Sequence, residues 1–85
     1  MIGRVVCSTA GRDKGKFLVI VGFSGESPLV ADGKERPLAR PKLKNPKHLR
    51  KTNSILEKQQ YTTDKSLRRS LSKFNLKPSL EQEED

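Results

Sequence analysis

The fold is decided by residues 2–23, which read IGRVVCSTAGRDKGKFLVIVGF. Residues 2–8 are rich in β-branched side chains and roughly alternate between apolar and polar, which predicts a strand. Residues 17–23 form the most apolar run of the chain, and its length suits a strand that is buried on both faces. Residues 9–16 hold two glycines and four charged side chains, which predicts a loop. We therefore expect two strands joined by a charged turn.

Downstream of this stretch the sequence predicts three further short strands. Residues 24–28 read as a turn. The dipeptide Asp32-Gly33 is typical of a two-residue hairpin, because a type I′ turn requires positive φ at both positions. The strand that returns from this hairpin should lie at a sheet edge, since Pro37 has no N–H to donate. We expect the three strands at residues 29–31, 34–39 and 47–52.

From residue 53 onward the pattern becomes helical. Residues 64–75 carry apolar side chains spaced by four and then three positions, which places them on one helix face. Thr63 is a candidate N-cap, Asp64 opposes the helix dipole, and Pro78 is expected to end the helix. A helix of this length is marginal alone in water, so we expect its apolar face to pack on the sheet, with a partner surface as the alternative. That face consists of Leu67, Leu71 and Phe74.

Composition limits what the chain can be. It has 85 residues, of which 32% are hydrophobic and 33% are charged, and its net charge is +8. A chain of this length forms one domain and buries only about 60% of its unfolded surface, which leaves little room for a deep active site. The positive charge is typical of a protein that binds a polyanion, nucleic acid first and a membrane surface second.

The sequence lacks a disulfide pair, a membrane span and a signal-peptide core, and these three features bear on where the protein is located. The only cysteine, Cys7, excludes an intramolecular disulfide. It follows Val5 and Val6, so we expect a buried structural thiol rather than a reactive one. No apolar run approaches the ~18 residues of a bilayer span, and the N-terminus has no signal-peptide core. We expect a cytoplasmic protein without a membrane partner.

The order of the motifs resembles a known family. Residues 3–6 (GRVV) and 11–21 (GRDKGKFLVIV) are similar to a KOW motif, in which two strands flank a glycine turn. Residues 29–33 (LVADG) and the basic run ending at 44–49 (KNPKHL) extend the similarity. Together, over about residues 2–52, they resemble the eukaryotic-type large-subunit ribosomal proteins numbered fourteen, six and twenty-seven, and the small bacterial KOW-domain RNA-binding proteins.

The resemblance implies a mainly β fold, namely an SH3-like five-strand barrel over residues 1–52 that includes a basic arm at 40–51. It also implies non-enzymatic binding of structured RNA, ribosomal RNA of the large subunit above all, by a monomer with further contacts to ribosomal proteins. Many KOW motifs have glycine where this sequence has Leu18, and this departure favours the ribosomal group over the elongation factors. Outside the motif we expect a helical extension at 53–78 and an acidic disordered tail at 79–85.

The loop at 11–16 is the first candidate RNA contact. Gly11 and Gly15 allow a tight turn and a close approach of a phosphate. The loop does not match a nucleotide-binding P-loop, because only three residues separate the glycines and Phe17 stands where the hydroxyl is needed. The alternative is a solvated turn that happens to be basic. The cations of the loop are Arg12, Lys14 and Lys16.

The arm at 40–51 is the second candidate. It holds six Lys or Arg and no acid, and these charges repel each other unless a polyanion binds them. Pro41 and Pro46 stiffen the arm, which lowers the ordering cost of binding. The alternative is a charged run that only keeps the protein soluble. The candidate contacts are Arg40, Lys42, Lys44, Lys47, His48, Arg50 and Lys51.

Nothing in the sequence predicts catalysis, a cofactor or a metal site. His48 is the only histidine, and neither a Cys/His pair nor a paired carboxylate motif accompanies it. We expect Phe17 and Phe23 in the core. The lack of other aromatic platforms argues against a reader of single strands and for recognition of folded RNA by shape and phosphate contact.

Two other classes of function remain open. A protein-interaction module of the translation or transcription machinery would contact RNA weakly and without salt dependence. A general polycation would bind duplex DNA or anionic vesicles as well as RNA. The polar side of the expected helix offers further cations for an RNA contact, namely Lys65, Arg68, Arg69 and Lys73.

Overall fold

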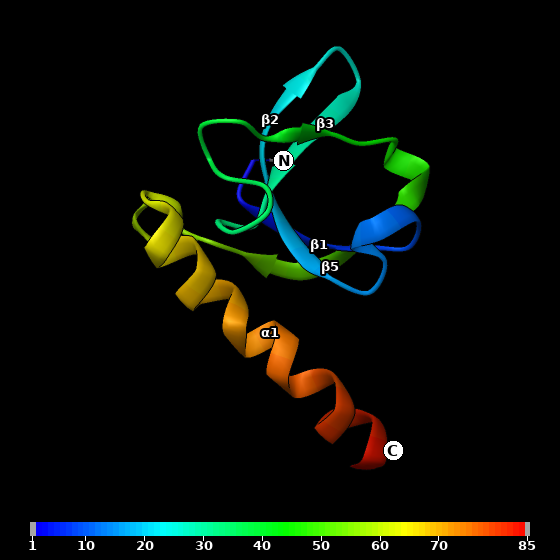
Figure 1. The fold of residues 1–85 in the computed structure, drawn as a ribbon. Coiled ribbons are helices and arrows are strands. Elements are labelled where there is room, and N and C mark those ends of the chain that lie inside the picture. Colours follow the sequence, from blue (N-terminus) through cyan, green and yellow to red (C-terminus); the bar gives the residue numbers. More distant parts are fainter. Residues whose placement is uncertain (1, 85) are drawn as a thin grey trace.

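Five strands form one antiparallel sheet in the order β4-β3-β2-β1-β5 in the computed structural model (Figure 1). The structure describes the backbone of residues 2–84 and the side chains of residues 2–74. The strands are β1 (Arg4–Ser8), β2 (Phe17–Ser24), β3 (Ser27–Ala31), β4 (Lys42–Leu43) and β5 (Leu49–Ile55). One long helix, α1 (Asp64–Glu84), follows. The prediction of a mainly β fold with a C-terminal helix is confirmed.

Strands β1 to β4 pair in chain order, and β5 returns to pair with β1. Val5 lies opposite Val19 in the β1–β2 pair, and Val6 lies opposite Lys51 in the β1–β5 pair. Directly opposite residues share a face of the sheet. Val5 and Val6 therefore point to opposite faces, and each face of the sheet receives apolar side chains from β1 and β2.

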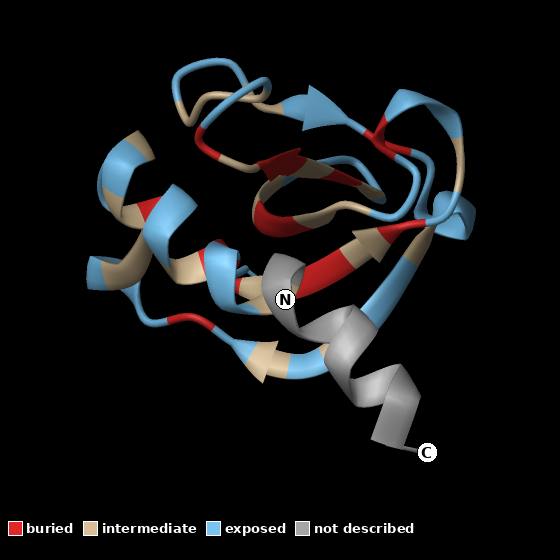
Figure 2. Cartoon of the chain, turned by 60° about the horizontal axis from the view of Figure 1, so that its bottom comes forward, coloured by how far each residue is buried: buried red, intermediate tan, exposed pale blue. Residues whose placement is uncertain are grey.

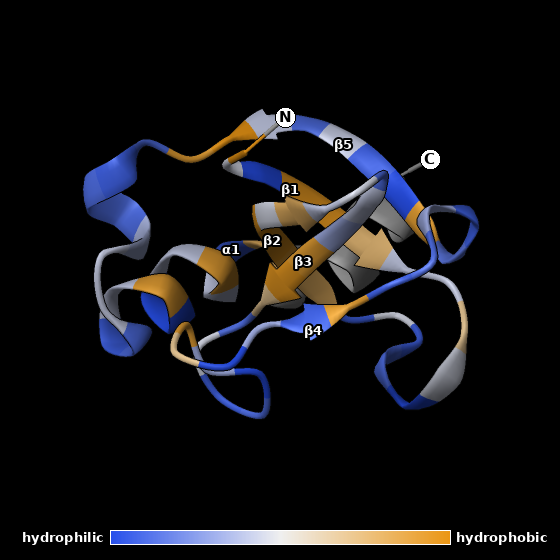
Figure 3. Ribbon diagram, turned by 90° about the horizontal axis from the view of Figure 1, so that it is seen from above, coloured by the Kyte–Doolittle hydropathy of each residue, from blue (hydrophilic) through white to orange (hydrophobic). Residues whose placement is uncertain are grey.

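The sheet has two apolar faces with different covers. Apolar residues concentrate on β1, β2 and β3 (Figure 3), and buried residues lie on these strands and on α1 (Figure 2). The first cluster joins the sheet to α1 and contains Val5, Val19, Ala31, Leu56, Leu67 and Leu71. The second cluster lies on the other face, is flanked by the half-buried Leu49, and contains Val6, Leu18, Ile20 and Val30.

Helix α1 begins where the sequence predicts. The Thr63 hydroxyl accepts a hydrogen bond from the Ser66 N–H at 3.1 Å, and the Ser66 hydroxyl accepts one from the Thr63 N–H at 3.1 Å. This reciprocal pair satisfies two donors at the helix start. Leu67 and Leu71 are buried against the sheet and Phe74 packs beside them. The prediction that this face packs on the sheet is confirmed.

The end of α1 differs from the prediction. The helix runs to Glu84, through Pro78, so the expectation that Pro78 ends it is wrong. A proline inside a helix removes the hydrogen bond to the carbonyl four residues earlier and bends the helix, but it leaves the remaining bonds in place. The predicted acidic tail at 79–85 lies outside the residues whose side chains are described. Within the described residues, no helix combines the length and apolar character that a bilayer crossing needs.

The predicted strand at 34–39 is absent, and a loop of residues 32–41 takes its place. The Asp32 carboxylate accepts hydrogen bonds from the N–H groups of Lys34 at 2.8 Å and Arg36 at 2.9 Å. An aspartate that bonds the backbone ahead of it forms a turn of its own and competes with a hairpin. The edge strand is β4 instead, inside the segment expected to be an extended arm.

Gly33 stays necessary in this loop for a reason that the hairpin prediction missed. Its φ is +80°, and a Cβ at this position would lie 2.5 Å from the backbone oxygen of Asp64. The Leu38 N–H donates to the Asp64 carboxylate at 2.8 Å, and the Arg68 guanidinium donates to the Gly33 carbonyl at 2.9 Å. The loop is therefore built against the first turns of α1.

Three local predictions need correction. Cys7 is half-buried rather than buried. Phe23 is 45% exposed and does not belong to either core cluster, whereas Phe17 is half-buried and lies against the Phe74 ring at a centroid distance of 5.5 Å. The last strand ends at Ile55, beyond the predicted end at residue 52.

Candidate nucleic-acid interface

The β1–β2 loop is a compact turn rather than a loose one. It contains a single 3₁₀ turn, η1 (Gly11–Asp13). The Gly15 N–H donates to the Ser8 carbonyl at 2.8 Å, and the Lys16 N–H donates to the Asp13 carbonyl at 2.8 Å. Gly11 and Gly15 both have positive φ, +78° and +86°, which is the conformational freedom expected of them. Nothing lies within 4 Å of a Cβ placed at Gly15, so the space beside its Cα is open.

Asp13 is the residue of this loop that sequence reasoning missed. It is 1% exposed, although it stands among cations in a surface turn. Its carboxylate lies 3.6 Å from Nε of Arg36 and 3.8 Å from Nζ of Lys44. A buried carboxylate requires such partners. The isolated acid in a basic loop was the only signal in the sequence that pointed to this role.

Lys44, which was predicted from the sequence as an RNA contact, is instead a buried partner of Asp13. It is 9% exposed, and its ammonium lies against Asp13 beneath the loop. The prediction treated Lys44 as one more cation of an extended arm, but the chain folds this part of the arm onto the sheet. The Lys44 N–H also donates to the Pro28 carbonyl at 3.0 Å, which holds the backbone in place after β4.

The second half of the arm folds beside the β1–β2 loop. A 3₁₀ turn, η2 (Pro46–His48), is capped by the Asn45 side chain, which accepts a hydrogen bond from the Lys47 N–H at 2.9 Å. The His48 carbonyl then accepts one from the Thr9 N–H at 2.8 Å. Strand β5 starts directly afterwards and pairs with β1. Two segments far apart in the sequence therefore lie side by side, as η1 and η2 do in Figure 1.

Most of the predicted cations in the β1–β2 loop and in the η2–β5 segment have exposed side chains. Asp13 is the only acid in residues 9–16 and 40–52, and it is buried. The outer surface of both segments therefore presents only positive charge and neutral groups. We call this region the basic end; within it, Arg50 and Lys51 extend from opposite faces of β5. Its residues are Arg12, Lys14, Lys47, His48, Arg50 and Lys51.

Three further predicted contacts lie elsewhere. Arg40 and Lys42 are exposed, but they belong to the loop before β4 and to β4, at the opposite end of the strand order from β5. Lys16 pairs with Glu35 at 3.0 Å. The hydrogen bond that the Lys16 ammonium donates to the Glu35 carboxylate raises the pKa of Lys16, and the charge of Lys16 is matched locally.

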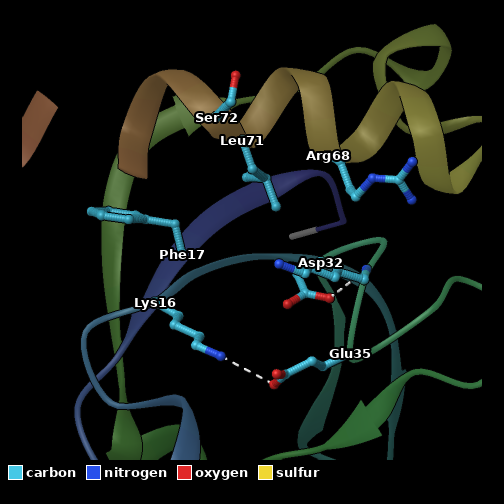
Figure 4. A pocket seen from close by; sticks show the side chains of 8 residues that line it. Lys16, Phe17, Asp32, Glu35, Arg68, Leu71 and Ser72 are labelled. Atoms are coloured by element: carbon cyan, nitrogen blue, oxygen red, sulfur yellow. Dashed lines mark hydrogen bonds and ion pairs between the residues drawn. The ribbon is translucent and has the colours of Figure 1, made fainter. Parts of the chain in front are cut away.

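A cavity of about 430 Å³ lies beside this pair, between α1 and the 32–36 segment (Figure 4). Leu71 and Phe17 contribute its apolar surface, and the remaining lining residues carry charges of both signs or a hydroxyl. The mixed charge does not favour a polyanion.

In the part of the chain with described side chains, no group of His, Cys, Asp and Glu could hold a metal ion. The expectation of no metal and no cofactor stays a prediction.

No family model matches the chain, and no curated protein matches it. The class of protein is therefore given by the structure: a small, mainly β protein whose antiparallel five-stranded sheet carries one C-terminal helix. The resemblance to KOW proteins remains an expectation.

Proposed function

We propose that this protein binds structured RNA without catalysis, and that ribosomal RNA of the large subunit is its target. The observation that carries the proposal is the basic end. It brings together exposed cations from residues 12–14 and 47–51 where η1 lies beside η2 and the start of β5, and the single acid of both segments is buried. A surface of this kind favours the closely spaced phosphates of a folded nucleic acid.

We further propose that the sheet is the SH3-like barrel of a KOW protein. The return of β5 to β1 and the short β4 at the other edge support this reading, as does the glycine turn between β1 and β2. In that framework the barrel is a platform and the basic end is its contact. Shape and phosphate contact would dominate recognition, as is usual for double-stranded RNA.

Sedimentation with ribosomal subunits across a salt series tests the proposal. We expect the protein to migrate with the large subunit at low salt and to be released as salt rises, because each phosphate contact displaces a counterion. A protein that stays at the top of the gradient at low salt would contradict the proposal and favour a protein-interaction module. Equal affinity for duplex DNA of the same length would instead indicate a general polycation.

A further inference from the structure

A second cavity, of about 180 Å³, opens next to the basic end. Its apolar lining includes Val6 and Ile20, which are buried, and Leu49, which is half-buried at the start of β5. Phe23 also lines it and is 45% exposed. The cavity is therefore the entrance to the second core cluster, with an aromatic ring at its mouth.

The entrance is open because the sheet does not close there. Strand β4 has two residues and, among the described residues, pairs only with β3, while β5 pairs only with β1. Within residues 2–84, no α-helix packs on this face as α1 packs on the other. The second cluster therefore meets the surface between β2 and the η2–β5 segment, which also carries four of the six residues of the basic end.

An irregularity in β2 aims Phe23 at this entrance. Ile20 lies opposite Val30, but Gly22 lies opposite Leu29, so two residues of β2 match one of β3. Such a bulge shifts the alternation of side chains by one position. Phe23 consequently lines the same cavity as Ile20, although three positions separate them and regular alternation would put them on opposite faces.

The charges around the entrance indicate what fits. Lys51 lines the cavity, and the exposed Lys47 belongs to the preceding η2 turn, whereas Arg50 extends from the opposite face of β5. Glu26 also lines the cavity, which disfavours a phosphate inside it but not a neutral ring. An apolar slot with an exposed aromatic side chain and a cation at its edge suits a base that stacks while its phosphate stays outside.

We infer that this cavity takes one unpaired nucleobase of the bound RNA, stacked on Phe23, with the adjoining phosphate on Lys51. The inference rests on the proposed RNA binding and adds a base-binding site to it. It gives the protein a way to distinguish a helix with a bulged base from a continuous one, which phosphate contacts alone do not provide.

The test uses two RNA hairpins of equal length, one fully paired and one with a single bulged 2-aminopurine. We expect wild-type protein to bind the bulged hairpin more tightly and to change its 2-aminopurine fluorescence. Phe23→Ala should weaken binding of the bulged hairpin roughly tenfold, as expected for loss of one stacked base, and leave the paired hairpin unaffected. Phe23→Tyr keeps the ring and should bind as wild type does.

The matched control is Leu43→Ala, because Leu43 is 51% exposed and does not line this cavity; it should change neither affinity. Thermal unfolding of each variant checks that the fold is intact. If the protein binds RNA but Phe23→Ala has wild-type affinity for both hairpins, the inferred base-binding site is wrong. That result would favour an apolar side chain of a protein partner as the occupant of the cavity. If wild type binds neither hairpin, the proposed function fails as well.

Discussion

Replacing Leu67 with alanine is expected to lower the free energy of unfolding by about 2–5 kcal/mol, the range for buried leucines. Leu67 is 0% exposed and belongs to the cluster that joins α1 to Val5, Val19 and Ala31 of the sheet. The loss combines the transfer of the removed methyl groups with the cavity they leave. Small domains have only about 5–15 kcal/mol of stability in total, so urea denaturation followed by circular dichroism should show a large shift of the midpoint.

Leu43→Ala is the control for this prediction. Leu43 is the same residue type but is 51% exposed on β4, and substitutions at such surface positions change stability by about 0.5 kcal/mol or less. Equal midpoints for Leu67→Ala and wild type would mean that α1 does not pack on the sheet.

Asp13→Ala is expected to destabilise the protein by about 2–4 kcal/mol, because it leaves the ammonium of Lys44 buried without its counter-charge. Breaking a buried ion pair from one side costs roughly 3–5 kcal/mol. We place the effect slightly lower, since the N–O distances are 3.6 and 3.8 Å and the Arg36 side chain is 26% exposed. Chemical denaturation measures the change directly.

The double variant Asp13→Ala/Lys44→Met separates charge from packing. Replacing both partners by apolar side chains removes the unpaired charge, and exchanges of this kind are often close to neutral. We expect the double variant to recover at least half of the lost stability. An Asp13→Ala protein as stable as wild type would show that the carboxylate is solvated and that the β1–β2 loop is not anchored through it.

Local sequence patterns predicted β1, β2 and α1, because these elements depend on the alternation, spacing and capping of residues that are close together in the chain. The alternation in residues 2–8 and the apolar run at 17–23 became β1 and β2, and the spacing of Leu67 and Leu71 became the buried face of α1. The N-cap at Thr63 could be predicted from the sequence because capping requires a side-chain acceptor next to the helix start.

Contacts between distant segments could not be read in the same way. The Asp32-Gly33 dipeptide does form a turn, but this turn packs against α1, which begins 31 residues after Gly33. The arm looked uniformly basic, and only the fold shows that Lys44 turns inward to Asp13. The bulge that exposes Phe23 arises from pairing between β2 and β3 and leaves no trace in composition.

The most direct test of RNA binding by the basic end compares two variants with the same loss of charge. Lys47→Gln/Arg50→Gln/Lys51→Gln removes three cations of the basic end. Lys58→Gln/Lys65→Gln/Arg69→Gln removes three exposed cations from η3 (Lys58–Tyr61) and α1. Affinity for a folded fragment of large-subunit ribosomal RNA is measured at several salt concentrations.

The slope of log affinity against log salt counts the displaced counterions, and each phosphate-binding cation contributes about one unit. We predict that the basic-end variant loses affinity and that its slope falls by about three, while the control variant keeps the wild-type slope. Equal losses in both variants would contradict the proposed interface, because net charge alone would then govern binding. An unchanged slope in the basic-end variant would contradict it as well.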